Sequence, residues 1–365
     1  MDNEAFSRII GENEYRTGRL DLNDCDLEVI PDLLNMDWLR VLNLNNNRIT
    51  KIENLDALSN LRELDLSYNR ITEIENLQGL TRLKKLFFYN NELTEIKGLE
   101  ALTSLEYLEL NENKITEIKG LETLTALKHF YIRTNQLTEI KGLESLSKLQ
   151  QLELIGNRIT EIKNLETLTS LRDLDLCWNK IREIKGLDTL VNLKYLCLRN
   201  NQITSIQGLQ TLKYLDLLRL NNNHISEITG LESLPYLRIL DLSNNHISEI
   251  KGLDALIRLS SINLDSNEIT EMKNLDSLTK LGTLTLANNY ISEIKNLQFC
   301  KLGYLDLSRN HITQIQKLTE LIQTKKLQIL RLYGIKENDL NVPSELFGDS
   351  DGYNCADDLK EYFSG

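Results

Sequence analysis

The feature that most constrains this chain is an asparagine that recurs at a fixed interval. It appears twelve times between residues 47 and 289, always 22 residues after the previous one, and one step of 21 then leads to Asn310. These residues are Asn47, Asn69, Asn91, Asn113, Asn135, Asn157, Asn179, Asn201, Asn223, Asn245, Asn267 and Asn289. A fixed interval of this size predicts a solenoid, in which each repeat forms one coil and stacks on the next.

Apolar residues follow a constant skeleton around each asparagine, clear in residues 105–124, LEYLELNENKITEIKGLETL. Leu108 and Leu110 flank Glu109 on a predicted short strand, so both leucines should point inward and Glu109 outward. One coil cannot bury its leucines alone, so stacking must make the core continuous. The repeating asparagine carries a donor and an acceptor, and we expect it to satisfy backbone groups of the turn after the strand.

The skeleton LxxLxLxxNxIxxIxxLxxL resembles that of the leucine-rich-repeat family over roughly residues 17–335. The resemblance implies an α/β solenoid, a right-handed horseshoe with a concave parallel β-sheet of about fifteen strands. Short 3-10 or helical turns are expected on its convex side. The predicted organisation is a helical cap over residues 1–16, repeats over 17–335 and a C-terminal cap over 336–365.

Charged residues recur with the same interval on the predicted convex side. Glu95, Glu117 and Glu139 belong to one column, and Lys119 and Lys141 belong to the column beside it. Columns of opposite sign that lie side by side predict a solvated surface whose charges compensate one another, with each pair contributing little to stability.

Composition narrows the class of protein. The chain has 54 acidic and 42 basic residues, a formal charge of −12, which argues against nucleic acid and anionic membranes as partners. Residues 1–10 have neither the basic start nor the apolar run of a signal peptide, and no apolar stretch is long enough to span a membrane. The five cysteines lack paired clusters, which predicts reduced thiols and a cytoplasmic protein, monomeric as an isolated domain.

No catalytic pattern stands out in the chain. It has four histidines and contains no HExxH, CxxC or GxSxG motif. His224, His246 and His311 each follow a repeating asparagine, so their recurrence is explained by the repeat. The sequence therefore predicts a protein that is not an enzyme and that uses neither a cofactor nor a metal.

The function is predicted to lie on the concave face, where strand residues point away from the core. Aromatic and acidic residues gather there in the earlier coils, and no core position requires them. Such a composition is typical of a protein-binding surface, here for a partner with a basic surface. The candidate residues are Asp65, Phe87, Tyr89, Tyr107, Glu109, Tyr131, Arg133, Glu153, Asp175, Trp178 and Tyr195. The alternative is that the aromatic residues only pack across neighbouring strands.

Two finer resemblances give two versions of this function. Residues 17–31, TGRLDLNDCDLEVIP, and the residues Pro343, Glu345, Ala356, Leu359, Tyr362 and Phe363 resemble the two ends of the repeat domain of Roco GTPases. That likeness implies a recognition or regulatory domain, although the chain has no GxxxxGK[ST] motif. Alternatively, the concave series Asp65, Phe87, Glu109 and Tyr131 resembles the leucine-rich regulatory subunit of protein phosphatase 1. There the series grips the phosphatase, and that family keeps a tryptophan where this chain has Arg219.

Overall fold

The computed structural model describes residues 17–297, 300–313, 327 and 329–333. The chain divides into two compact units, Met1–Lys180 and Ile181–Gly365, and each is described by itself. The two expected caps lie outside the described residues. No helix within the described ranges is long and apolar enough to cross a membrane.

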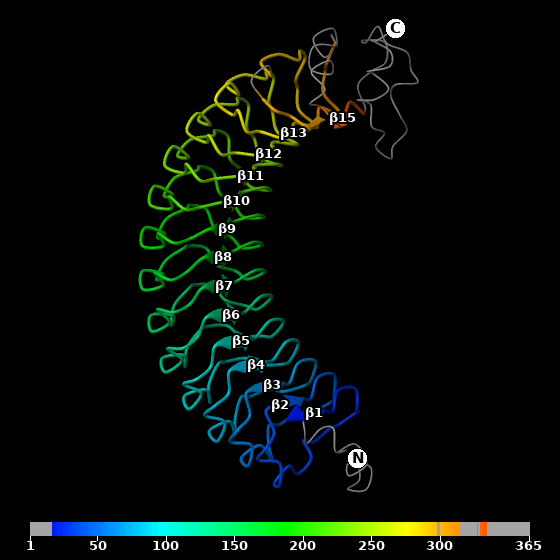
Figure 1. The fold of residues 1–365 in the computed structure, drawn as a ribbon, viewed down its shortest axis with the longest axis vertical. Coiled ribbons are helices and arrows are strands. Elements are labelled where there is room, and N and C mark those ends of the chain that lie inside the picture. The colour runs from blue at the N-terminus through cyan, green and yellow to red at the C-terminus, as the bar shows by residue number, and fades with distance from the viewer. Residues whose placement is uncertain (1–16, 298–299, 314–326, 328, 334–365) are drawn as a thin grey trace. The chain divides into compact units, whose positions relative to one another are not determined.

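The described part of the first unit contains eight strands of three residues each (Figure 1). Each strand runs parallel to the next and in register with it, so Leu86 lies opposite Leu108. The strands are β1 (Arg19–Asp21), β2 (Val41–Asn43), β3 (Glu63–Asp65), β4 (Lys85–Phe87), β5 (Tyr107–Glu109), β6 (His129–Tyr131), β7 (Gln151–Glu153) and β8 (Asp173–Asp175).

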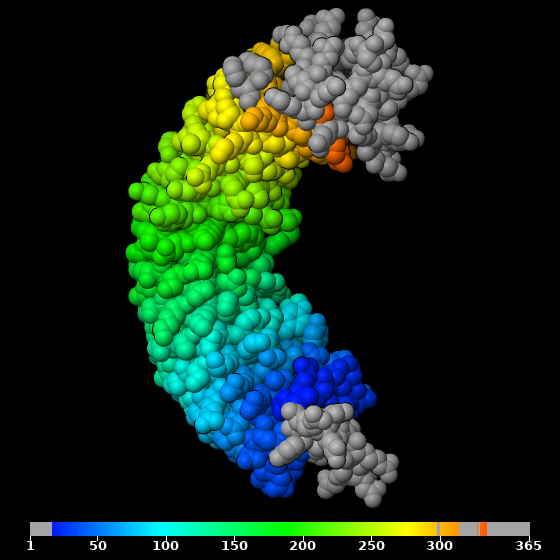
Figure 2. Space-filling model, viewed as in Figure 1, coloured from blue at the N-terminus to red at the C-terminus, as the bar shows by residue number. Residues whose placement is uncertain are grey.

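The described part of the second unit contains seven strands paired in the same way. They are β9 (Tyr195–Cys197), β10 (Leu217–Arg219), β11 (Ile239–Asp241), β12 (Ser261–Asn263), β13 (Thr283–Thr285), β14 (Tyr304–Asp306) and β15 (Ile329–Arg331). The expected parallel strands, about fifteen in number, are therefore confirmed. In the space-filling view the coils of each unit pack directly on one another (Figure 2).

The core of each unit is a stack of aliphatic side chains. The middle residue of every described strand and the residue just after the strand are buried, as Leu108 and Leu110 show. Phe130 and Phe88 take these two positions in other coils, and they are the largest fully buried side chains among the described residues. The predicted inward direction of the skeleton leucines is confirmed.

The repeating asparagines form the expected ladder along the coils. Asn135 donates from Nδ2 to the carbonyl of Leu110 in the preceding coil at 2.9 Å and to the carbonyl of Arg133 at 3.0 Å. Its Oδ1 accepts from the amide of Ile115 at 3.0 Å. One buried amide therefore satisfies three backbone groups, two of which belong to the preceding coil.

The convex segments differ from the prediction of 3-10 or helical turns. Leu58 donates to the carbonyl of Leu55 at 3.0 Å, and Leu61 donates to the carbonyl of Leu58 at 2.9 Å. Bonds that close at every third residue make two consecutive β-turns, whereas a 3-10 helix closes them at successive residues. The spacing of the leucines explains this, because a leucine at every third position must turn back into the core.

The convex charge columns compensate one another as expected. Lys119 Nζ lies 3.1 Å from Glu95 and 3.2 Å from Glu117, and Lys141 Nζ lies 3.2 Å from Glu117 and 3.0 Å from Glu139. The two lysines hold the pKa of the Glu117 carboxyl below its ordinary value. Each lysine therefore bridges two coils on an exposed surface, where single pairs stabilise little.

Candidate functional site

Three aromatic rings lie against one another on strands β4 to β6 of the first unit. The ring centroids of Phe87 and Tyr107 are 4.9 Å apart, and those of Tyr107 and Tyr131 are 5.1 Å apart. The His129 ring, on the same strand as Tyr131, lies 6.0 Å from Tyr107. We call Phe87, Tyr107 and Tyr131 the aromatic cluster. All three are half-buried, because the rings cover one another.

Glu109 lies inside this cluster. Strand pairing places it opposite Phe87 on one side and Tyr131 on the other. The Tyr107 hydroxyl donates to its carboxylate at 3.4 Å, and Asn111 Nδ2 donates at 2.7 Å. Burial among the rings raises the pKa of the Glu109 carboxyl, and these two donors partly oppose the rise. The same burial raises the pKa of Tyr107, and it raises the pKa of Tyr131 to about 12.

Glu153 follows in the same column and already has a cationic partner. Arg133 donates to its carboxylate from Nε, and a second guanidinium nitrogen lies beside the same oxygen. Burial still raises the pKa of Glu153, and Arg133 acts against it. The Arg133 guanidinium also lies 5.9 Å from the Tyr131 ring centroid. A cationic group on a partner would therefore compete with Arg133 for Glu153, whereas no ion pair occupies Glu109 within the described residues.

A second pair of aromatic residues lies at the ends of β3 and β4. The rings of Tyr68 and Tyr89 are 4.8 Å apart, and the Tyr89 hydroxyl donates to Glu112 at 2.7 Å. That hydrogen bond, with a smaller contribution from Tyr68, raises the pKa of Tyr89. Sequence reasoning left Tyr68 out of the candidate site, although it directly precedes the ladder residue Asn69.

Tyr68 and Trp178 occupy backbone positions that aromatic residues rarely take. Their φ angles are 52° and 57°, in the left-handed region that favours glycine and asparagine. The matching positions of other coils hold asparagine, glycine or other polar residues, such as Asn46, Gly156 and Glu112. Tyr68 is 45% exposed and Trp178 is 58% exposed, so neither contributes much to the core. A strained and exposed aromatic residue indicates a functional role rather than a structural one.

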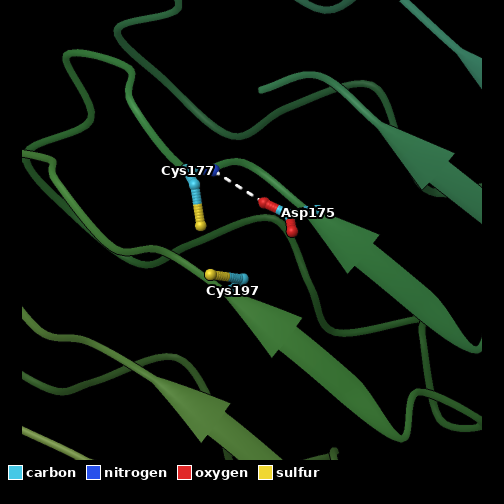
Figure 3. A group of neighbouring side chains, drawn as sticks. All are labelled: Asp175, Cys177 and Cys197. Carbon is cyan, nitrogen blue, oxygen red and sulfur yellow. Dashed lines mark hydrogen bonds between the residues drawn. The ribbon is translucent and has the colours of Figure 1, made fainter. Parts of the chain in front are cut away.

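The remaining candidate residues lie outside the aromatic cluster. Asp65 ends β3 and accepts from the Ser67 amide at 2.9 Å. Asp175 ends β8 and accepts from the Cys177 amide at 3.0 Å (Figure 3). Tyr195 begins β9 in the second unit and is half-buried. Asp65, Asp175 and Tyr195 therefore lie in coils outside the aromatic cluster. The structure gathers the other candidates Phe87, Tyr107, Glu109 and Tyr131 into one place.

The cysteines correct one expectation. Cys177 is disulfide-bonded, and so is Cys197 in the second unit, which contradicts the prediction that all five thiols are reduced. Cys25 and Cys300 are free. Metals bind the thiolate form of cysteine, so the Cys177 sulfur beside Asp175 is not available as a ligand in this state.

Comparison with known proteins agrees with the repeat. The family model described as Leucine Rich repeats (2 copies) matches residues 59–101, 103–145, 191–233 and 215–255. No curated protein matches the chain. An internalin (inlF) from Listeria monocytogenes is 30% identical, with a TM-score of 0.73, over 80% of this chain and 87% of the internalin. A leucine-rich-repeat protein from Leptospira interrogans is 25% identical, with a TM-score of 0.74, over 91% of this chain and 95% of that protein.

These matches agree with the ladder, the three-residue strands and the buried leucines in both units. The functional domain of InlJ from Listeria monocytogenes, at 24% identity and a TM-score of 0.72, supports the fold in the same way. The chain belongs to the leucine-rich-repeat family.

Proposed function

We propose that the first unit is a non-catalytic protein-binding module whose contact surface is centred on Glu109 and the aromatic cluster. The observation that carries this proposal is a half-buried carboxylate enclosed by Phe87, Tyr107 and Tyr131 that forms no ion pair with any described residue, the charge of Arg133 acting on it only from a distance. Aromatic residues at the centre of an interface supply most of the binding energy, and an enclosed carboxylate adds a preference for a cationic partner group.

The strained positions of Tyr68 and Trp178 support the same proposal. The left-handed backbone costs an aromatic residue about 1 kcal/mol or more of conformational free energy at each position, and asparagine or glycine there would lower that cost. Aromatic residues persist there although the core gains little from them, which is understandable if a partner covers them. The partner inferred from these features is a protein surface or segment with arginine or lysine at its centre.

The experiment that tests this function is an affinity purification with the whole chain as bait, followed by calorimetry with each purified partner. The proposal expects a partner whose binding is weakened by substitutions at Phe87 and Tyr131. A partner that binds both variants as tightly as the wild type would place the functional surface elsewhere.

A regulatory subunit of a protein phosphatase 1-like enzyme is a second, finer candidate. Asp65, Phe87 and Glu109 lie opposite one another on β3, β4 and β5, as an alternating acidic and aromatic column requires. Direct titration with the phosphatase catalytic subunit tests this candidate, and absence of binding at micromolar concentration would remove it.

A regulatory domain of a Roco-like GTPase is the other finer version. The residues that carry this resemblance at the C-terminal end, from Pro343 to Phe363, lie outside the described residues. Titration with the GTPase domain of a Roco protein, in its two nucleotide states, tests this version. If the GTPase domain binds this chain in neither nucleotide state, the Roco-like version is wrong.

A further inference from the structure

The second unit carries an exposed apolar surface that the proposed function does not use. It lies on the second β-turn of each convex segment, which ends just before the strand. In three successive coils this turn is closed by Leu215 to Leu212 at 3.0 Å, by Leu237 to Leu234 at 3.1 Å and by Leu259 to Leu256 at 2.9 Å. Both leucines of each turn are buried, so the two central residues must face outward.

The same turn in the first unit shows what the fold requires at these two positions. Most of its coils place small or polar residues there, such as the pairs 59–60 (Ser-Asn), 103–104 (Thr-Ser) and 147–148 (Ser-Lys). In the second unit the corresponding residues include Val191, Tyr214, Tyr236 and Ile257, with exposed fractions of 45%, 56%, 41% and 56%. Because the turn forms without apolar side chains, the fold does not explain them.

The two tyrosines and a neighbouring arginine are in contact, and the other exposed side chains belong to the same or adjacent coils. The rings of Tyr214 and Tyr236 are 5.7 Å apart, and the Arg258 guanidinium lies 4.4 Å from the Tyr236 ring centroid. Ile239, on the strand β11 that follows the Tyr236 turn, adds a further side chain that is 37% exposed. We call Val191, Tyr214, Tyr236, Ile239, Ile257 and Arg258 the edge patch. Exposed apolar patches rimmed by charged residues mark interaction sites.

The charged central residues of these turns and of the turn in the next coil are basic, whereas the exposed carboxylates Glu232 and Asp254 belong to the preceding β-turn of their segments. Lys213, Arg258 and Lys280 are exposed, and no ion pair engages them within the described part of the chain. The nearby carboxylate of Asp216 is already held by Arg238, which donates to it from two nitrogens. A basic surface on a chain with a net charge of −12 selects for an acidic partner group at this place.

We propose that the edge patch docks an amphipathic peptide segment of a partner protein. The apolar face of the segment lies on Tyr214 and Tyr236, and its acidic side chains meet Arg258, Lys213 and Lys280. The Arg258 guanidinium carbon lies over the Tyr236 ring, 4.4 Å from its centroid, and a guanidinium in such a position can still donate from its N–H groups to a carboxylate.

A peptide explains the composition of the patch better than a nucleic acid does. Tyrosine and arginine also stack on bases, but Val191, Ile239 and Ile257 have no role in such stacking. Three unpaired cations on an acidic protein are also a weak footprint for a phosphate backbone.

The test uses synthetic fluorescent peptides and the whole chain, with binding followed by anisotropy. The first peptide has leucines at helical spacing and glutamates elsewhere. A second has lysine in place of every glutamate, and a third has serine in place of every leucine. We expect the first peptide to bind at least about tenfold more tightly than either of the others.

Variants locate the binding site. Tyr214→Ser with Tyr236→Ser should weaken binding of the glutamate peptide at least about tenfold. Arg258→Gln should reduce the difference in affinity between the glutamate and lysine peptides. Ser59→Ala with Thr103→Ala, at central positions of the same turn in the first unit, should bind as the wild type does. Phe87→Ala with Tyr131→Ala should also leave this binding unchanged, which separates the edge patch from the proposed function. Unchanged circular dichroism and melting temperature establish that each variant is folded.

Three results would overturn the proposal. One is equal affinity for the glutamate and lysine peptides. Another is tyrosine-dependent binding of anionic lipid vesicles or of single-stranded RNA in place of the peptide. The third is a wild-type dimer in sedimentation that the tyrosine variant converts to a monomer, which would make the patch a contact between copies of this chain.

Discussion

Tyr107 packs against Tyr131 with ring centroids 5.1 Å apart, although strand pairing places Tyr107 opposite His129. The diagonal contact lets one ring touch both Phe87 and Tyr131 and closes the space around Glu109. Neighbouring strands lie about 4.8 Å apart, so side chains on three adjacent coils can act as one surface.

The double variant Phe87→Ala, Tyr131→Ala should weaken partner binding at least about tenfold, because aromatic anchors at an interface centre typically cost about 2 kcal/mol or more on truncation. Calorimetry against the purified partner measures this. Ser261→Ala with Thr283→Ala, on strands of the second unit, is the matched control and should change little. The opposite pattern would move the site to the second unit.

Tyr68→Asn and Trp178→Asn should each stabilise the protein and weaken partner binding. Asparagine relieves the left-handed backbone, and the expected gain in unfolding free energy is roughly 0.5–1 kcal/mol per site. Denaturant unfolding measures the gain, and calorimetry measures the affinity. Loss of stability in both variants would show that these rings support the fold and would remove the argument from strain.

Glu109→Gln tests the enclosed carboxylate. Its pKa is raised by burial, so the carboxylate takes up a proton at a higher pH than an exposed glutamate does. A cationic partner group binds the ionised form, so affinity should fall on acidification, beginning at a higher pH than an exposed glutamate would give. The variant should bind roughly five- to tenfold more weakly at neutral pH and depend less on pH. Equal pH profiles for the two proteins would show that Glu109 does not meet a cation.

Asn135→Ala should cost on the order of 1–3 kcal/mol, because it leaves the Leu110 carbonyl and the Ile115 amide without their side-chain partner. His224→Ala changes an exposed residue that follows a ladder asparagine, and it should stay within roughly 0.5 kcal/mol of the wild type. Urea unfolding of both variants measures the difference. Similar costs would contradict the structural role given to the ladder.

Asp265 provides a prediction about stability in the second unit. Burial raises its pKa to about 6, although its Oδ1 accepts from the Ala287 amide at 2.7 Å. The folded state therefore binds a proton between about pH 4 and 6 that the unfolded state does not, so this residue makes stability fall as pH rises through that window.

Asp265→Asn keeps the acceptor and removes the buried charge. It should stabilise the protein at pH 7 by on the order of 1–3 kcal/mol and flatten the pH dependence between about 4 and 6. Denaturant unfolding across this range measures both effects. A destabilised variant at pH 7 would mean that the ionised carboxylate has a favourable partner.

The repeat made much of the fold predictable. The interval between asparagines fixes the coil, and alternation around residues such as Leu108 fixes which side chains enter the core. The convex segments were predicted as short 3-10 or helical turns because six residues are too few for a long helix. Leucines at every third position, such as Leu55, Leu58 and Leu61, favour two β-turns instead.

The site was predicted less completely because side-chain packing depends on rotamers that a sequence pattern does not contain. The 22-residue interval predicted that Phe87, Glu109 and Tyr131 lie in one column. It did not predict that the Tyr107 side chain points towards Phe87 and Tyr131. Tyr68 could have been found, because the position before a ladder asparagine holds asparagine or glycine in seven of thirteen coils and other polar or charged residues in the rest, apart from Tyr68 and Trp178. A large aromatic residue there is a visible departure from the repeat.

The ladder also shows where the repeat can change length. Asn310 follows Asn289 by only 21 residues, yet it bonds the Leu286 carbonyl at 2.8 Å and accepts from the Ile291 amide at 2.9 Å, as a ladder residue should. Asn296 still reaches the Met272 carbonyl and Leu305 still lies opposite Leu284, so the missing residue falls between Asn296 and Tyr304. The outer turn of this coil therefore accommodates the loss of one residue while the ladder and the strand register are kept. A gene of this kind can grow or shrink by in-frame duplication or loss of whole coils, and each new copy arrives with its hydrogen-bonding partners already in phase.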